Sequence, residues 1–89
     1  MWLDTEAHLA LYRFVRELES APPVKSVHGL MMGAEMHVWI VLRERSRDAR
    51  YAVYTAQLKA DPEFLLMLHF TESLDAVPKD AARVDRVRI

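Results

Sequence analysis

The chain has 89 residues, no cysteine and a formal net charge of −1. This length predicts one domain, and the lack of cysteine excludes disulfides and thiolate metal sites, which leaves nitrogen and oxygen ligands. The charge balance argues against nucleic acid as a partner, because nucleic acid selects a basic patch. No apolar run approaches the roughly 20 residues of a membrane helix, and the N-terminus lacks the signal-peptide pattern. We therefore expect a cytoplasmic protein without direct membrane insertion.

The first predicted element is an amphipathic helix over residues 4–20. Asp4 or Thr5 can cap its start by accepting hydrogen bonds from free backbone N–H groups. Pro22 and Pro23 follow it, and proline ends a helix because it has no N–H to donate. Apolar residues at three- and four-residue spacing predict one buried face: Leu3, Ala7, Leu11, Phe14 and Leu18.

A β-hairpin is predicted next, with strands over residues 24–31 and 35–43. Gly33 between them supplies the backbone freedom that a tight turn needs. Side chains alternate between the two faces of a strand. The second strand therefore presents Met36, Val38, Ile40 and Leu42 on one face and His37, Trp39, Val41 and Arg43 on the other.

A second helix is predicted over residues 47–60, with Ser46 as its cap and small residues on its buried face. A third strand over residues 64–71 follows and places Leu65, Met67, His69 and Thr71 on one face. The predicted fold is α+β in the order α-β-β-α-β, with a three-stranded mixed sheet and two helices on one face. Residues 1–78 form the single domain, and residues 79–89 form a weakly patterned charged tail in which an edge segment is the alternative.

The sheet face away from the helices has no covering element in this prediction, yet it is apolar. An apolar face of this kind is usually hidden by a partner, and two-fold dimers are the commonest oligomers. We therefore expect a homodimer whose interface contains Trp39, Val41, Leu65 and Met67.

The same face carries His37 and His69, and neighbouring strands lie about 4.8 Å apart. Neutral imidazole is the commonest metal ligand, so the two rings could share one ion, with His28 reaching the same region. Glu35 and Glu72 are the acids nearest to these histidines in the sequence. The alternative is a set of sheet-surface histidines with ordinary hydrogen bonds. Because the sequence shows no cysteine nucleophile, glycine-rich phosphate loop or nucleophile elbow, we do not expect an enzyme.

Three motifs carry these histidines in order: P-V-K-S-V-H-G-L-M-M with His28, A-E-M-H-V-W-I-V with His37, and L-L-M-L-H-F-T-E with His69. They resemble the cytoplasmic C-terminal domain of the cation diffusion facilitators, which export zinc and related divalent metals. The resemblance covers roughly residues 8–73. Thr71 stands where the family has an acidic residue, and Glu72 follows it.

The resemblance implies a free-standing form of this regulatory domain, with a ferredoxin-like, metallochaperone-like fold. It also implies a zinc site, or a site for another divalent transition metal, formed by His28, His37, His69 and Glu72. The expected role is metal sensing, buffering or regulation of a membrane metal transporter. The chain itself lacks the family's transport region.

Two alternatives remain. The same α-β-β-α-β order occurs in ring-building modules of secretion systems, and A-P-P-V-K-S-V resembles their helix-to-strand junction. That interpretation makes the protein a structural assembly module without metal. The third is a degenerate, non-catalytic nucleotidyltransferase-like domain, in which A-E-M-H-V-W-I-V replaces the strand of paired aspartates.

Overall fold

The structure is a computed structural model of the whole chain, and it describes residues 2–18, 24–44, 46–60 and 66–84. Side chains are described from residue 7 onward. In chain order the elements are α1 (Trp2–Leu18), β1 (Val24–Met32), β2 (Glu35–Leu42), α2 (Arg47–Ala60), β3 (Met67–Thr71), the 3-10 helix η1 (Leu74–Ala76) and β4 (Ala82–Arg83). None of the described helices is long and apolar enough to cross a membrane.

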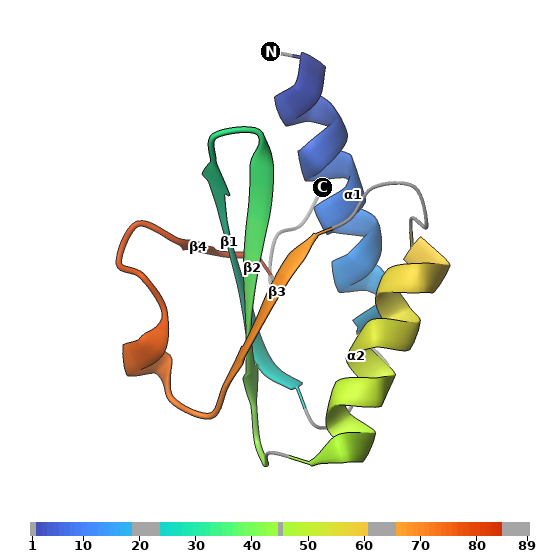
Figure 1. Cartoon of the computed structure of the whole chain (residues 1–89), viewed down its shortest axis with the longest axis vertical. Helices are drawn as coiled ribbons and strands as arrows, with labels where there is room; N and C mark the ends of the chain where they lie inside the picture. The colour runs from blue at the N-terminus through green and yellow to red at the C-terminus, as the bar shows by residue number, and fades with distance from the viewer. Residues whose placement is uncertain (1, 19–23, 45, 61–65, 85–89) are drawn as a thin grey trace.

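The described elements form two layers, with α1 and α2 side by side on one face of the sheet (Figure 1). The sheet order is β3-β2-β1-β4, in which β1 is antiparallel to β2 and β4, and β2 is parallel to β3. The α+β class and the placement of both helices on one face are confirmed. The sheet is mixed as predicted but has four strands, not three.

The fourth strand comes from the segment predicted to be a charged tail. Ala82 and Arg83 pair with Gly29 and His28 of β1, and the Val84 N–H donates to the Val27 carbonyl at 2.8 Å. Backbone groups make this pairing, so it needs no apolar side chains and leaves no periodic pattern in the sequence. Residues 85–89, which include Val87 and Ile89, lie outside the described part of the chain.

The helix-covered face holds the hydrophobic core. Phe14 of α1, Val38 and Ile40 of β2, and Val53 of α2 are all 0% exposed. Gly29 allows α1 to approach β1 closely, because a Cβ at this position would lie 2.9 Å from Leu11 Cδ2. The alternation predicted for β2 therefore gives the inward face of the sheet correctly.

The hairpin turn fixes the register of the two central strands. Its two turn residues follow Met32 and precede Glu35, and Gly33 has a φ of 64°. A glycine with positive φ at the first turn position suits the right-handed twist of a hairpin. With this register, Trp39 stands opposite His28 and His37 opposite Leu30.

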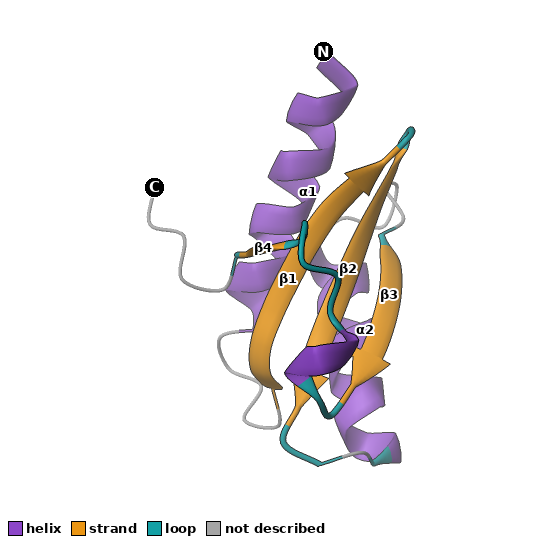
Figure 2. Ribbon diagram, turned by 90° about the vertical axis from the view of Figure 1, so that its left-hand side faces the viewer, coloured by secondary structure: helices purple, strands orange, loops and turns teal. Residues whose placement is uncertain are grey.

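The opposite face of the sheet is partly covered by the connection from β3 to β4. This connection, which includes η1, leaves the outer edge of β3 and crosses in front of the sheet to the far edge of β1 (Figures 1 and 2). It lies over the end of β2 that carries Val41, and Val41 is only 2% exposed. The expectation that this chain leaves the whole face uncovered is therefore wrong, because the segment after β3 returns across it.

Candidate metal-binding site

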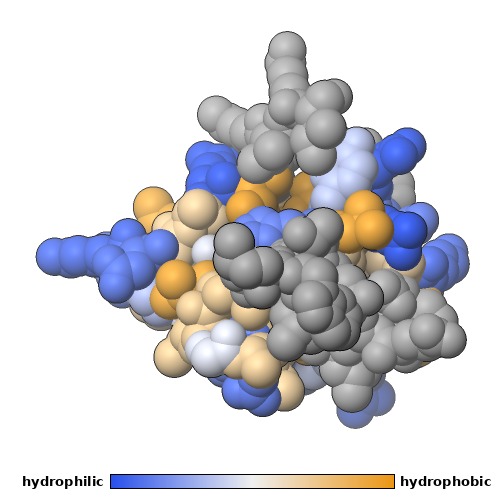
Figure 3. Space-filling view, turned by 90° about the horizontal axis from the view of Figure 1, so that it is seen from above, coloured by the Kyte–Doolittle hydropathy of each residue, from blue (hydrophilic) through white to orange (hydrophobic). Residues whose placement is uncertain are grey.

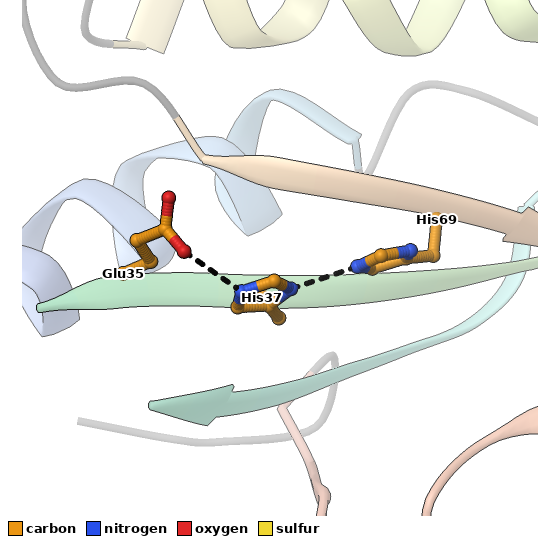
Figure 4. A network of polar contacts seen from close by, with 3 residues as sticks. All are labelled: Glu35, His37 and His69. Carbon is orange, nitrogen blue, oxygen red and sulfur yellow. Dashed lines mark hydrogen bonds and ion pairs between the residues drawn. The ribbon is translucent and has the colours of Figure 1, made fainter. Parts of the chain in front are cut away.

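The parallel pairing of β2 and β3 brings two histidines together on the face away from the helices. His69 stands opposite Trp39 in the register, which places it diagonally next to His37. His37 Nδ1 and His69 Nε2 lie 2.9 Å apart and share a hydrogen bond (Figure 4). The predicted convergence of these two side chains is thus present in the structure.

A carboxylate lies on the other side of the His37 ring. Glu35 precedes His37 by two residues, so both side chains stand on one face of β2. Glu35 Oε1 lies 3.4 Å from His37 Nε2, and the side chains of His37 and Glu35 are 17% and 55% exposed. The three residues form a line of carboxylate, imidazole and imidazole (Figure 4).

Trp39 supports both imidazoles through ring stacking. Its ring lies 4.7 Å from that of His69 with an interplanar angle of 16°, and 6.1 Å from that of His37 with an angle of 29°. The two imidazole rings are nearly coplanar, with centroids 5.1 Å apart and an interplanar angle of 13°, and they meet edge to edge through their 2.9 Å hydrogen bond. Offset aromatic stacks such as those on Trp39 restrict ring rotation and stabilise by about 0.5–1.5 kcal/mol per pair. The pair is thus held by neighbours as well as by its hydrogen bond.

The electrostatics of the pair distinguish its two members. Burial of the imidazole, and then the charge of His37 beside it, lower the pKa of His69. The Glu35 carboxylate oxygen accepts hydrogen bonds, so a hydrogen on His37 Nε2 suits this contact and leaves the Nδ1 lone pair of His37 facing His69. That lone pair is the electron pair that a metal ion would use.

His28 does not join this pair. In the sheet its position is separated from that of His69 by Trp39, a span of two strand spacings or about 10 Å. His28 is 7% exposed, and its Nε2 shares a 2.9 Å hydrogen bond with Ser26 Oγ. The hydrogen bond and the burial give it a structural role in this arrangement.

Glu72 follows the end of β3 and is exposed, and no ion pair or hydrogen bond connects it to either histidine among the described residues. Within that part of the chain, no three histidine or acidic side chains are arranged to hold a metal ion. The structure therefore brings together His37 and His69, two of the four predicted ligands, and places Glu35 beside His37. From the sequence, Glu35 was only an acid near these histidines.

The residues predicted for a dimer interface differ in how much surface they offer. Met67 is 38% exposed and Trp39 is half-buried, whereas Val41 has almost no free surface within the single chain. Leu65 lies outside the described residues. Met32 at the hairpin turn is 50% exposed. The view from above shows the top end of the molecule, where orange hydrophobic residues reach the surface among blue hydrophilic ones (Figure 3). The β3–β4 connection itself adds the exposed side chain of Leu74.

A scan against protein-family models, a search of curated proteins and a search of solved structures each found no match to this chain.

Proposed function

We propose that the protein binds a divalent transition metal, zinc first among them, through His37 Nδ1 and His69 Nε2. The observation that carries this proposal is the order Glu35–His37–His69, with the carboxylate and the second imidazole at opposite nitrogens of the His37 ring. A histidine that binds a metal almost always donates its other ring N–H to a carboxylate, carbonyl or water. Glu35 is placed to play that orienting role.

The separation of the two nitrogens suits a shared ion. Two nitrogens bonded to one zinc ion at 2.0–2.1 Å and at a tetrahedral angle lie about 3.4 Å apart. The present distance between the two nitrogens is 2.9 Å. Small rotations of the rings and loss of the proton between them would bring the nitrogens to the separation that one zinc ion requires. Because the ion replaces a proton, affinity falls as pH decreases.

Two imidazoles fill only half of the four positions that zinc takes. We propose that water or a second copy of the chain supplies the rest, with the copies meeting over Trp39 and Met67 on the uncovered part of the sheet face. Both residues are partly exposed, and a two-fold axis there would bring two histidine pairs toward each other. His28 and Glu72 are not required in this arrangement.

The two-layer fold and the histidine pair also suit the role that the exporter resemblance implies. We propose a cytoplasmic domain with a ferredoxin-like, metallochaperone-like fold that senses or buffers metal, or regulates a membrane transporter. In this proposal the domain acts by holding the ion or by contacting another protein. The assembly-module alternative needs no metal, so metal binding separates it from this proposal, whereas nucleotide binding would support the nucleotidyltransferase-like alternative.

Thermal unfolding with and without zinc chloride near pH 7.5 tests the proposal. Zinc at a hundredfold excess over its dissociation constant adds about 2.7 kcal/mol, which raises the Tm of a domain of this size by about 10–20 °C. His37→Gln and His69→Gln should each abolish the shift, and Glu35→Gln should weaken zinc binding by about 10–100-fold.

The matched control is His8→Gln, which removes an exposed imidazole from α1 and should keep the full zinc shift. His28→Gln should also keep it, after correction for its own effect on stability. If zinc leaves the wild-type Tm unchanged, or if the shift survives loss of both His37 and His69, the proposed site is wrong. Light scattering with and without zinc then tests whether a second copy completes the site.

A further inference from the structure

The outer face of α2 is apolar where a surface helix is normally charged. Tyr51, Tyr54 and Leu58 are 73%, 51% and 64% exposed. Their spacing of three and four residues places them in one stripe along the helix. The buried side of α2 is formed by other residues, Ala49, Val53, Ala56 and Gln57. The stripe therefore contributes little to the core, and an exposed apolar stripe of this kind is typical of an interaction surface.

One member of the stripe, Tyr54, contacts the sheet. The Tyr54 ring meets Phe70 of β3 edge to face, with centroids 5.4 Å apart and an interplanar angle of 65°. Val53, the residue before Tyr54, is 0% exposed and fixes the helix on the sheet. An aromatic side chain that is already held in place, as Tyr54 is here, loses little side-chain entropy when a partner binds.

The charges along the stripe are of one sign. Arg47 and Arg50 are exposed and stand one turn before Tyr51 and Tyr54, at four-residue spacing. Asp48 is the only acidic residue of α2, and it lies about 100° around the helix axis from Arg47. The α2 stripe, defined as Arg47, Arg50, Tyr51, Tyr54 and Leu58, is thus apolar along its length and positive at its N-terminal end.

We infer that the α2 stripe binds an acidic amphipathic helix of another protein. A partner with apolar residues at helical spacing would cover the tyrosines and Leu58, and its Asp or Glu side chains would meet Arg47 and Arg50. Tyrosine and arginine are the residue types enriched where binding energy concentrates. No described element lies over the outer side of α2 (Figure 1), so such a helix needs no rearrangement of the fold.

The charges also argue against a second copy of the chain or a nucleic acid as the partner of the α2 stripe. A second copy packed stripe to stripe offers Arg47 and Arg50 no acidic residue of the stripe in either direction, and a parallel packing would also bring like charges together, which disfavours association. A nucleic acid requires a broader basic surface than two arginines beside an exposed leucine, and the whole chain has a net charge of −1. An acidic helix is the partner whose charge and shape both match.

Selection from a library tests this inference without knowledge of the natural partner. Helical peptides of about 16 residues, displayed on phage with random surface positions, are selected on the wild-type protein. The library is first depleted on the Tyr51→Ala/Leu58→Ala variant. Enriched peptides should carry three apolar residues at helical spacing, flanked by Asp or Glu. Synthetic versions should bind the depletion variant about tenfold or more weakly than wild type.

Two further variants separate charge from apolar contact. Arg47→Gln/Arg50→Gln should weaken the selected peptides and reduce the sensitivity of their affinity to salt, whereas Met67→Ala, on the other side of the sheet, should leave affinity unchanged. The changed residues are exposed, and thermal unfolding verifies that each variant is folded. The inference is overturned if no enriched peptide depends on Tyr51 and Leu58, or if dependent peptides lack acidic residues. It is also overturned if a single-stranded DNA oligonucleotide, phosphatidylserine vesicles or a second copy binds through the stripe instead.

Discussion

The two faces of the sheet are made by the same strands but serve different purposes. On the helix-covered face, Val38 and Ile40 of β2 are 0% exposed and belong to one apolar cluster with α1 and α2. On the other face, the intervening residues His37 and Trp39 are half-buried and make a hydrogen bond and ring stacks. Because side chains alternate along a strand, one strand supplies both the core and the candidate site. The helix-covered face specifies the fold, and the opposite face is free to carry chemistry.

The largest expected effect on stability comes from comparing substitutions at two neighbouring residues of β2. Ile40→Ala removes a fully buried side chain and should lower the free energy of unfolding by about 2–5 kcal/mol, since a cavity adds to the lost transfer energy. Trp39→Ala should cost less, because part of this larger side chain is already exposed and the site can rearrange toward solvent. Urea unfolding of both variants measures the difference. Equal or reversed losses of unfolding free energy would show that the site face, which is the sheet face that carries His37 and Trp39, contributes as much to stability as the helix-covered face.

A second test concerns the buried polar pair on the site face. Ser26 and His28 are 6% and 7% exposed and share a 2.9 Å hydrogen bond. Ser26→Ala removes the hydroxyl that hydrogen-bonds with the buried imidazole of His28, and it should lower the free energy of unfolding by about 1–3 kcal/mol. A double-mutant cycle with His28→Gln isolates the pairwise energy. If the two substitutions are strictly additive, Ser26 and His28 are not coupled, and the structural role assigned to His28 loses its support.

The two long helices and the first three strands could be predicted from the sequence because each has a strong local signal. The three- and four-residue apolar spacing gave α1, and the alternation along β2 gave both faces of that strand, including the positions of Ile40 and His37. Gly33 marked the turn, and its φ of 64° is the conformation that the prediction required. These features depend on neighbours in the sequence, so periodicity and turn chemistry are sufficient to find them.

The features that the sequence did not reveal depend on long-range placement. The β3–β4 connection crosses the site face, and its sequence shows no periodicity that would indicate where it lies. The separation of His28 from His69 depends on Trp39 lying between them in the sheet register, which strand assignment alone does not give. Glu35 was visible as an acid two residues before His37, but only the register places both side chains together at 3.4 Å.

The smallest expected effect is the pH dependence that His69 contributes to stability. Burial, and then the charge of His37, lower the pKa of His69 in the folded protein, whereas a histidine in the unfolded chain has a pKa of about 6.5. Below about pH 6.5 the unfolded chain therefore binds more protons at this position than the folded chain does. The free energy of unfolding falls as pH decreases through this range, until the lower pKa of the folded state is passed. Above about pH 7.5 both states are neutral at His69, and its contribution no longer changes.

Urea unfolding in metal-free buffer, at intervals between about pH 7.5 and 5.5, measures this slope. His69→Gln should lose less stability than wild type as the pH falls, because glutamine does not titrate. His8→Gln, which removes an exposed imidazole from α1, is the matched control for the loss of a histidine outside the site. The same slope in wild type and His69→Gln would mean that the site face does not disfavour a proton on His69. In that case the face with the histidine pair would differ from the helix-covered face in its geometry alone, and protonation of His69 would not affect stability.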